Sequence, residues 1–397
     1  MITRLIYVGG MVACLAVFAD ADVIRSIDPD ETTSTSAAVV VGDVPLAHTG
    51  QFLPCDLKGG IVGKGDVAAQ VAKIVEDLGV ALGQAGSGLD RLVKLNVGVA
   101  AAGDVAEVRR ALAARLAGKA KPAVAYVVGP LMPPEARVAM DAVAAAEGSR
   151  GGETVNRLSC AVYGPPGFPQ VAVFPAGGRI YISGQAVKGK DLAESTRLTL
   201  EGLKRTLDWL GRKESQVVQV RMLGDLTAGR AAVEAEIARV FSVPLVFVEG
   251  DAGNPIEIEL VAAAGNKEGG APPPDVEYLT PPWMQSSPVY SKVVRSNRGG
   301  AIYVSGLCGA SATDVPGEIR EAFGILKDVL TKAGSDLRHL VKATYFVVDA
   351  DTAKALAEIR PEFYDPKAPP AASRATTAGV GREGRRFTMD MIAVPAR

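Results

Sequence analysis

The sequence predicts an α+β protein made of three tandem copies of one two-layer unit, in which helices cover one face of a mixed sheet. Three observations predict this fold. A short apolar strand with a hydroxyl residue and a glycine recurs at residues 45–51, 179–185 and 301–307. An amphipathic helix with an acidic residue at its start follows each copy, and further strands complete each unit. A repeat of this kind indicates one supersecondary unit copied along the chain.

The first helix of each unit is predicted from its cap. Asp66, Asp191 and Asp314 stand where a helix would begin, and an aspartate there accepts hydrogen bonds from the free amide groups of the first turn. Apolar residues then recur at helical spacing. In the three units they are Val71, Ile74, Val75, Leu78 and Leu82; Leu200, Leu203, Leu207 and Leu210; and Ile319, Phe323, Leu326 and Leu330.

The rest of each unit reads as strand, helix and one or two final strands, which gives the order β-β-α-β-α-β-β. Gly- and Pro-rich stretches at 148–153 and 266–275 are typical of linkers. The units are therefore predicted over 36–147, 155–265 and 276–397. The middle strands are predicted to begin at Leu92, Val217 and Leu340, the second helices to cover 104–117, 230–240 and 353–363, and the last strands to cover 137–144, 256–262 and 386–394.

The last strand of the second unit shows how the units would pack. Glu257 and Glu259 lie on one face of this strand, whereas Ile256, Ile258 and Leu260 lie on the other. Helices cover one face of each sheet, so the other face needs a partner. We therefore expect the three units to bury these faces against each other and to close into an intramolecular ring.

Composition excludes several classes of protein. The chain has 397 residues, of which 48% are hydrophobic and 22% charged, and its formal net charge is -1. This balance does not favour a nucleic-acid binder, which usually carries a basic excess. Only two histidines occur, and the four cysteines lie far apart without a C-x-x-C pair. We therefore expect no metal and no other cofactor.

The amino terminus is predicted to be a leader. Residues 1–21 combine one early arginine, an apolar run and an A-x-A-like site, which is typical of a secretory signal peptide. Residues 22–35 then read as a polar tether. The protein is exported or periplasmic if this leader is real, and cytoplasmic if a misassigned start codon created it. No other segment approaches the length of a membrane span.

The strand with Ser-Gly, the acidic-capped helix, the VKATYFV strand and the IEIELVA strand together resemble the reactive-intermediate deaminase (RidA or YjgF) family. Units 2 and 3 match it clearly and unit 1 in outline. The family has a chorismate-mutase-like fold and forms homotrimers with a cleft at each subunit interface. The resemblance implies three such folds fused into an intramolecular pseudo-trimer, which would be a monomer.

The resemblance also implies a chemistry, in which an arginine holds a substrate carboxylate and a glutamate activates water against a 2-imino or enamine acid. In unit 3 the arginine position falls on Arg374, the cleft tyrosine on Tyr290, and the strand end on Ser305 and Gly306. The glutamate position of unit 3 falls on Thr388, with Asp390 two residues further on the same face. Unit 2 has Glu257 at the glutamate position, Val246 at the arginine position and Phe168 at the tyrosine position, and unit 1 has Val124 and Ala139.

Two functions therefore stay open. The first is a hydrolase that converts 2-imino or enamine acids to 2-oxo acids and ammonia, with Asp390 or Glu257 activating water. The second is a non-catalytic module that binds a small carboxylate ligand or a protein partner. Arg374 would anchor the ligand carboxylate, or would instead pair with Glu257 or Glu259 in an interface. RNA cleavage, described for some relatives, is disfavoured because the chain shows no basic patch with interleaved aromatic residues.

Overall fold

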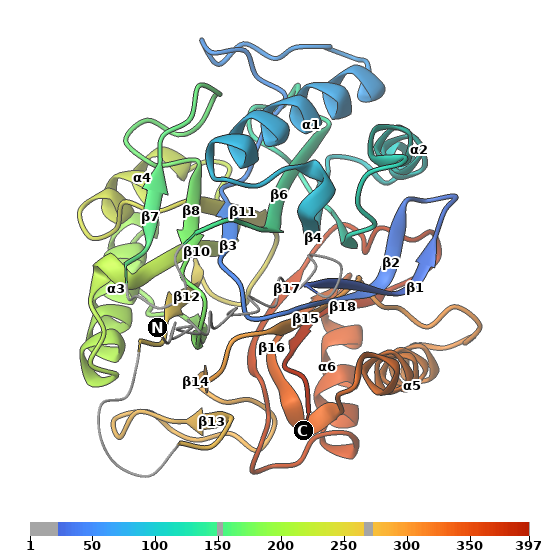
Figure 1. The fold of residues 1–397 in the computed structure, drawn as a ribbon. Coiled ribbons are helices and arrows are strands. Elements are labelled where there is room, and N and C mark those ends of the chain that lie inside the picture. Colours follow the sequence, from blue (N-terminus) through green and yellow to red (C-terminus); the bar gives the residue numbers. More distant parts are fainter. Residues whose placement is uncertain (1–22, 149–153, 266–272, 397) are drawn as a thin grey trace, which may run out of the picture.

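The computed structural model describes residues 23–148, 154–265 and 273–396. It contains three units, each with the element order β-β-β-α-β-α-β-β, which has one strand more at its start than the sequence predicted. The first strand of unit 1 begins at Ile24, before the predicted start of that unit at residue 36. Figure 1 shows the helices around the outside of the molecule and the strands toward its interior. The predicted leader, residues 1–21, and most of both predicted linkers lie outside the described residues.

The elements have the following bounds. Unit 1 contains β1 (Ile24–Asp30), β2 (Thr35–Val41), β3 (Leu46–Thr49), α1 (Val67–Gln84), β4 (Leu92–Val99), α2 (Val105–Leu116), β5 (Ala123–Val128) and β6 (Val138–Ala145). Unit 2 contains β7 (Asn156–Leu158), β8 (Val171–Phe174), β9 (Arg179–Gln185), α3 (Leu192–Trp209), β10 (Val217–Gly224), α4 (Arg230–Ala238), β11 (Leu245–Glu249) and β12 (Glu257–Ala263). Unit 3 contains β13 (Val276–Leu279), β14 (Val293–Ser296), β15 (Ala301–Val304), α5 (Val315–Ala333), β16 (Leu340–Val347), α6 (Ala350–Ile359), β17 (Ala371–Thr376) and β18 (Phe387–Ala393).

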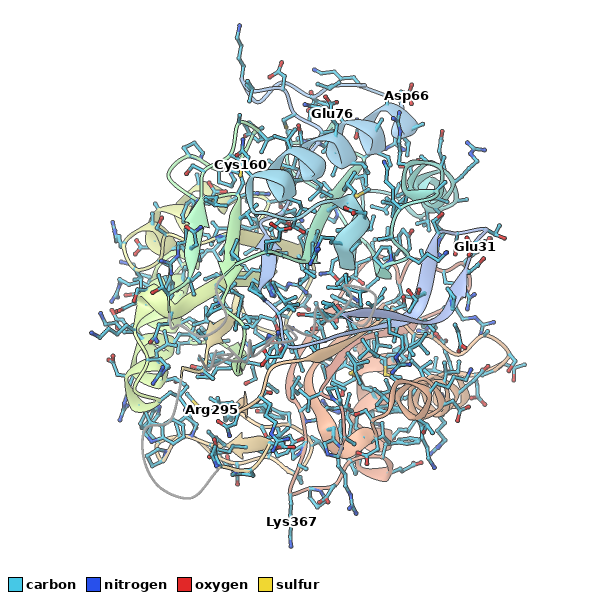
Figure 2. The ribbon with its side chains drawn as sticks, viewed as in Figure 1. Glu31, Asp66, Glu76, Cys160, Arg295 and Lys367 are labelled. Atoms are coloured by element: carbon cyan, nitrogen blue, oxygen red, sulfur yellow. The ribbon has the colours of Figure 1, made fainter. Side chains whose placement is uncertain are left out.

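The three predicted helix caps are confirmed. Asp66, Asp191 and Asp314 each accept a hydrogen bond from a backbone amide in the first turn, at 2.9, 2.8 and 2.7 Å. Figure 2 shows Asp66 at the start of α1. The second helix of unit 3 begins three residues earlier than predicted, because Asp349 caps it through the Thr352 amide at 2.8 Å.

Each unit arranges its own strands in the same order. The orders are β5-β4-β6-β3, β11-β10-β12-β9 and β17-β16-β18-β15, with one parallel pair at the start of each. Each of these sheets is then extended by the first strands of another unit: β2 pairs with β15, β8 with β3, and β14 with β9. Unit 1 therefore contributes strands to unit 3, unit 2 to unit 1, and unit 3 to unit 2.

The amino-terminal segment differs from the polar tether predicted over residues 22–35. β1 pairs with β2 in a hairpin, with Glu31 at its tip (Figure 2). Ile27 on β1 is 5% exposed and packs in the hydrophobic core of unit 3. A neighbouring sheet edge thus orders a segment whose own sequence has no strand periodicity.

Each unit has a hydrophobic core between its helices and its sheet. A further cluster lies on the opposite sheet faces and takes residues from all three units. Val93, Val218 and Val341, which occupy matching places in β4, β10 and β16, are fully buried in it. The prediction that the uncovered sheet faces bury against each other is confirmed, and this packing brings the strand ends of different units together.

Candidate active site

The candidate site begins at the end of β9 in unit 2, at Ser183 and Gly184. The Gly184 amide donates a hydrogen bond to Ser373 Oγ on β17 of unit 3 at 3.0 Å. The Ser183 amide donates to the carbonyl oxygen of Lys292, also of unit 3, at 3.0 Å. One hydrogen bond to a side-chain hydroxyl and one between backbone groups therefore hold two segments of unit 3 against this turn.

Glu257, the first residue of β12, lies directly over Gly184. A Cβ atom on residue 184 would come within 1.9 Å of Glu257 Oε1, so the carboxyl group reaches this place only because the turn carries a glycine. The Ser373 side chain and the Arg374 backbone amide lie within hydrogen-bonding range of the same carboxyl group. The glutamate of unit 2 thus meets β17 of unit 3.

The pKa of the Glu257 carboxyl group is raised strongly. Burial raises its pKa to about 7, the neighbouring Glu259 charge adds to the rise, and the contacts with Ser373 and Arg374 oppose it. A carboxyl group with such a pKa is present in both forms at neutral pH. It is therefore suited to take up and return a proton in one catalytic cycle.

Arg374 lies on β17 with a half-buried side chain. Among the described residues it forms no ion pair, and Glu259, one of the two acidic partners that the sequence left open, is engaged otherwise. Glu259 accepts hydrogen bonds from Lys342 Nζ at 2.7 Å and from Ser373 Oγ at 2.6 Å. Glu257 is near enough for the Arg374 charge to lower its pKa, without forming an ion pair. The guanidinium group is thus available to an anionic ligand.

Tyr290 belongs to the same region. Its neighbour Ser291 donates a backbone hydrogen bond to the Pro370 carbonyl oxygen at 3.0 Å, just before β17. Lys292 Nζ lies 2.5 Å from the Tyr290 hydroxyl and 4.4 Å from the centre of its ring. The segment that carries Tyr290 therefore lies between β17 and the Ser183 turn, whose Ser183 amide donates a hydrogen bond to the Lys292 carbonyl oxygen.

Ser305 and Gly306 lie at a different interface, between units 3 and 1. Ser305 Oγ accepts a hydrogen bond from the Val124 amide at 2.7 Å, and the Gly306 amide donates to the Val124 carbonyl oxygen at 3.0 Å. They line a cleft of about 290 Å³, in which Thr388 stands at the position that corresponds to Glu257. The structure therefore does not bring Ser305 and Gly306 together with Arg374.

Asp390 lies in a central cavity of about 40 Å³. Lys94 Nζ donates to Asp390 Oδ1 at 2.6 Å, and the lysine and the aspartate are 3% and 10% exposed at their side chains. Asp141 of unit 1 and Glu259 of unit 2 occupy the matching strand positions and line the same cavity. Asp390 is therefore part of an ionic core shared by the units and is placed apart from Arg374.

The strand register also revises the positions matched to Arg374. On the parallel partner strands, Arg374 lies opposite Tyr345, Tyr126 opposite Val97, and Phe247 opposite Met222. Tyr345, Val97 and Met222 are each the sixth residue of their strand, so Tyr126 and Phe247 are the counterparts of Arg374. The sequence motif had placed the counterparts at Val124 and Val246, two and one residues earlier.

Sequence reasoning missed Ser183, Gly184 and Ser373 as site residues. The repeat places a Ser-Gly pair in residues 179–185 of unit 2 as well, but the motif alone favours the pair of unit 3, the unit that carries Arg374. The site instead combines the Ser-Gly turn and the glutamate of one unit with the arginine strand of the next. Nothing in local periodicity indicates which unit follows which in space.

The described part of the chain contains no group of three or more His, Cys, Asp or Glu side chains that could hold a metal ion. Within those same residues, no helix combines the length and the apolar character needed to cross a membrane.

Solved structures of several bacterial proteins are similar to single units. NMB1025 of Neisseria meningitidis, a YjgF family member, is 19% identical over 31% of this chain and 97% of its own, with a TM-score of 0.24. YyfB of Yersinia pestis, a Rid family protein of unknown function, is 22% identical over 31% and 98%, with a TM-score of 0.29. Rv2704 of Mycobacterium tuberculosis, of the YjgF/YER057c/UK114 family, is 19% identical over 24% and 78%, with a TM-score of 0.22. At such TM-scores the likenesses carry no weight by themselves, and among curated proteins none matches.

The family model described as Endoribonuclease L-PSP matches residues 28–146 and 284–394, which together make up more than half of the chain. These segments correspond to units 1 and 3, so unit 1 matches although its sequence showed the pattern only in outline. Unit 2, which supplies Glu257, lies outside the matched segments. The chain belongs to the Endoribonuclease L-PSP family, to which the RidA/YjgF proteins belong.

Proposed function

We propose that this protein hydrolyses 2-imino or enamine acids to 2-oxo acids and ammonia at the site between units 2 and 3. The proposal is carried by the approach of Glu257 and Arg374 across this interface. A carboxyl group with a pKa of about 7 lies beside a guanidinium group that has no ion pair among the described residues. Family membership supports the proposal, because the RidA resemblance implies this reaction.

Arg374 would bind the substrate carboxylate through two parallel hydrogen bonds, which match the planar fork of a guanidinium group. This contact would hold the iminium carbon near Glu257. The carbon is already electrophilic, so positioning supplies most of what the reaction requires.

The proton steps would pass through Glu257. The ionised carboxylate takes a proton from water as the water oxygen attacks the iminium carbon, and the C=N electron pair moves to nitrogen. Glu257 then returns that proton to nitrogen, and the C–N bond breaks with its electron pair on ammonia. The remaining hydroxyl proton passes to ammonia, which leaves a 2-oxo acid and an ammonium ion.

Ser373 would act as a positioning residue for this chemistry. Its hydroxyl donates to Glu259 at 2.6 Å and accepts from the Gly184 amide at 3.0 Å. Glu259 is further held by Lys342, which together with Arg221 keeps its pKa below the usual range in spite of burial. A charged Glu259 thus stays next to Glu257 and contributes to the raised pKa of that group.

The test is hydrolysis of 2-iminopropionate, generated in situ and followed as pyruvate formation above the buffer rate. The full chain is compared with Arg374→Ala and with Arg320→Ala, an exposed arginine of unit 3 that pairs with Glu362. We expect acceleration by the wild type and by Arg320→Ala, and its loss in Arg374→Ala. A folded wild type that gives no acceleration would contradict the hydrolase.

A second candidate function is binding of a small carboxylate without turnover. The observation that favours it is the loss of the glutamate at two of three matching positions, which hold Thr388 and Ala139. Pyruvate binding that requires Arg374, in a protein without hydrolysis, would support this function over the first.

We also propose that the single chain takes the place of the homotrimer that the family resemblance implies. The exchange of strands between units supports this, because each unit completes the sheet of another. A solution mass near the chain mass of 41.1 kDa is expected by light scattering, whereas a mass three times larger would contradict it.

A further inference from the structure

A second group of arginines lies outside the proposed active site, in the loop between β17 and β18. Residues 377–386 contain Arg382, Arg385 and Arg386, whereas the matching loops at 129–137 and 250–256 contain one arginine and none. A short charge run of this kind is by default a solvated turn. It is nevertheless a feature of unit 3 alone and does not follow from the repeat.

The guanidinium groups of this loop have unusual partners. Arg382 Nη1 lies 3.6 Å from Cys308 Sγ, and Arg385 donates to two backbone carbonyl groups, at residues 310 and 312, at 2.6 and 2.9 Å. Within the described residues neither is paired with a carboxylate. Arg386, by contrast, forms an ion pair with Asp349. Carbonyl and sulfur partners carry no compensating charge. The Arg385 charge also acts on Glu318, whose pKa is raised by burial and lowered in part by Arg385.

A third arginine joins them from unit 1. Arg109 on α2 donates to the Gly381 carbonyl oxygen at 3.0 Å, and its guanidinium carbon lies 4.0 Å from the centre of the Tyr126 ring. It too has no carboxylate partner in the described part of the chain. Arg109, Arg382 and Arg385 are called the arginine groove from here on, because they line one cavity of about 800 Å³ between units 1 and 3.

The arginine groove carries a net positive charge. Glu383 is the acidic residue among those that line it, so three guanidinium groups face one carboxylate and the balance is about +2. The groove adjoins the cleft at Ser305 and Gly306, whose lining includes Arg109 and Arg382 and also Asp28 and Asp30. Of these two carboxylates, Asp28 is paired with Lys332. Within the lining of the arginine groove itself the surplus stays at about +2, and a bound anion would neutralise it.

The loop that supplies these charges is fixed in place. Gly381 has a φ of 71°, and a Cβ atom there would lie 2.3 Å from Tyr126 Cβ, so the loop backbone packs directly on unit 1. Val128 and Gly379 exchange backbone hydrogen bonds at 2.9 and 3.3 Å. Such anchoring fixes the backbone that carries Arg382 and Arg385 before a ligand arrives, which lowers the entropic cost of binding.

We propose that the arginine groove binds the phosphate group of a small phosphorylated molecule. A phosphomonoester carries a charge of about -1.5 to -2 at neutral pH, which matches the surplus, and its oxygens accept forked hydrogen bonds from guanidinium groups. This ligand differs in charge and place from the imino acid at Arg374. A nucleic-acid strand is disfavoured because the whole chain has a net charge of -1 and the surplus is confined to this hollow.

The test measures binding of phenyl phosphate to the full chain by calorimetry, with benzoate and a single-stranded oligonucleotide as comparison ligands. Arg382→Ala is the informative variant, because within the described residues the Arg382 side chain hydrogen-bonds to a sulfur atom alone, so its removal leaves the backbone anchors of the loop intact. We expect a loss of about 10- to 100-fold in affinity, as for removal of a charge-assisted hydrogen bond. Arg320→Ala is the matched control and should bind as the wild type does.

Several results would overturn the proposal. They are absence of phenyl phosphate binding at millimolar concentrations, equal binding by Arg382→Ala, and benzoate binding as tight as phosphate. Tighter binding of the oligonucleotide with a steep salt dependence would replace the small ligand by a nucleic acid. Hydrolysis of 2-iminopropionate should be unchanged in Arg382→Ala, so failure of this proposal and failure of the proposed hydrolase are told apart.

Discussion

The interface between units 2 and 3 and the interface between units 3 and 1 share one backbone frame and differ in the side chains that it holds. In both, the glycine of a Ser-Gly pair donates its amide across the interface, Gly184 to Ser373 and Gly306 to Val124. Each glycine lies where the neighbouring unit approaches closely. The repeat therefore keeps the same amide donor at both interfaces, whereas the acceptor is a side-chain hydroxyl at the first and a backbone carbonyl oxygen at the second.

The two interfaces differ in the reactive side chains that this shared backbone carries. Glu257 and Arg374 meet at the first, whereas Thr388 and Tyr126 occupy the matching positions at the second. At the second, Tyr126 supports Arg109 and so contributes to the arginine groove. Units with the same fold therefore carry different sites. The side chains at each interface, and not the shared fold, determine what that interface can bind or catalyse.

The largest effect on catalysis is expected when the residue at position 257, between units 2 and 3, is replaced by the type found at the matching position between units 3 and 1. Glu257→Thr removes the group that transfers protons, so kcat/KM for 2-iminopropionate should fall by about 10²- to 10⁴-fold. Thr388→Ala is the matched change at the other interface and should leave hydrolysis unchanged. Equal losses in both variants would show that the two interfaces do not differ in chemistry.

The next largest effect is expected on stability, when the buried ion pair of Lys94 and Asp390 in the ionic core shared by the units is broken. Lys94→Met leaves Asp390 buried without its partner, which should lower the free energy of unfolding by about 3–5 kcal/mol in denaturant titrations. Replacing both residues by apolar ones should recover most of the loss, because no charge then stays unpaired.

The exposed pair of Lys204 and Glu214 supplies the control for that measurement. Lys204→Met should change the free energy of unfolding by less than about 1 kcal/mol. A Lys94→Met effect no larger than this would mean that Asp390 finds another partner or takes up a proton.

The anchoring role of Arg374 predicts a smaller effect from a conservative change. Arg374→Lys keeps the charge and loses the planar fork, so KM should rise about 10-fold while kcat changes little. Steady-state kinetics at saturating and limiting 2-iminopropionate separate the two. A fall in kcat without a rise in KM would place Arg374 in the chemical step and not in carboxylate binding.

Much of this architecture follows from the sequence alone. The caps at Asp66, Asp191 and Asp314 and the face shared by Glu257 and Glu259 were predictable, because N-caps and alternation are local patterns. The carboxylate-anchoring role of Arg374 stays a prediction, and the register of its counterparts did not follow from the motif.

The contacts between units were not predictable in this way. The pairing of Ser183 with unit 3, the ion pair of Asp390 with Lys94 and the order in β1 all join segments far apart in the chain. Such contacts depend on which sheet edges meet, and one sequence contains no local signal for that choice. For this reason the sequence predicts Ser305 as a site residue, whereas the structure places Ser183 against the segments of unit 3 at the candidate site.

The smallest expected effect is on thermal stability. The pH dependence of Tm should differ between a variant at the first interface and a variant at the second. The pKa of Glu257 is raised from 4.5 to about 7 in the fold, so its favourable contribution is complete below pH 4.5 and is lost as the pH rises through 7. Glu257→Gln does not titrate, so its Tm relative to wild type should increase by a few degrees from pH 5 to pH 8. Thr388→Ala should show a constant difference over the same range. A constant difference for Glu257→Gln would mean that the carboxyl group titrates near its usual pKa, and the proton transfer assigned to it would then lack its basis.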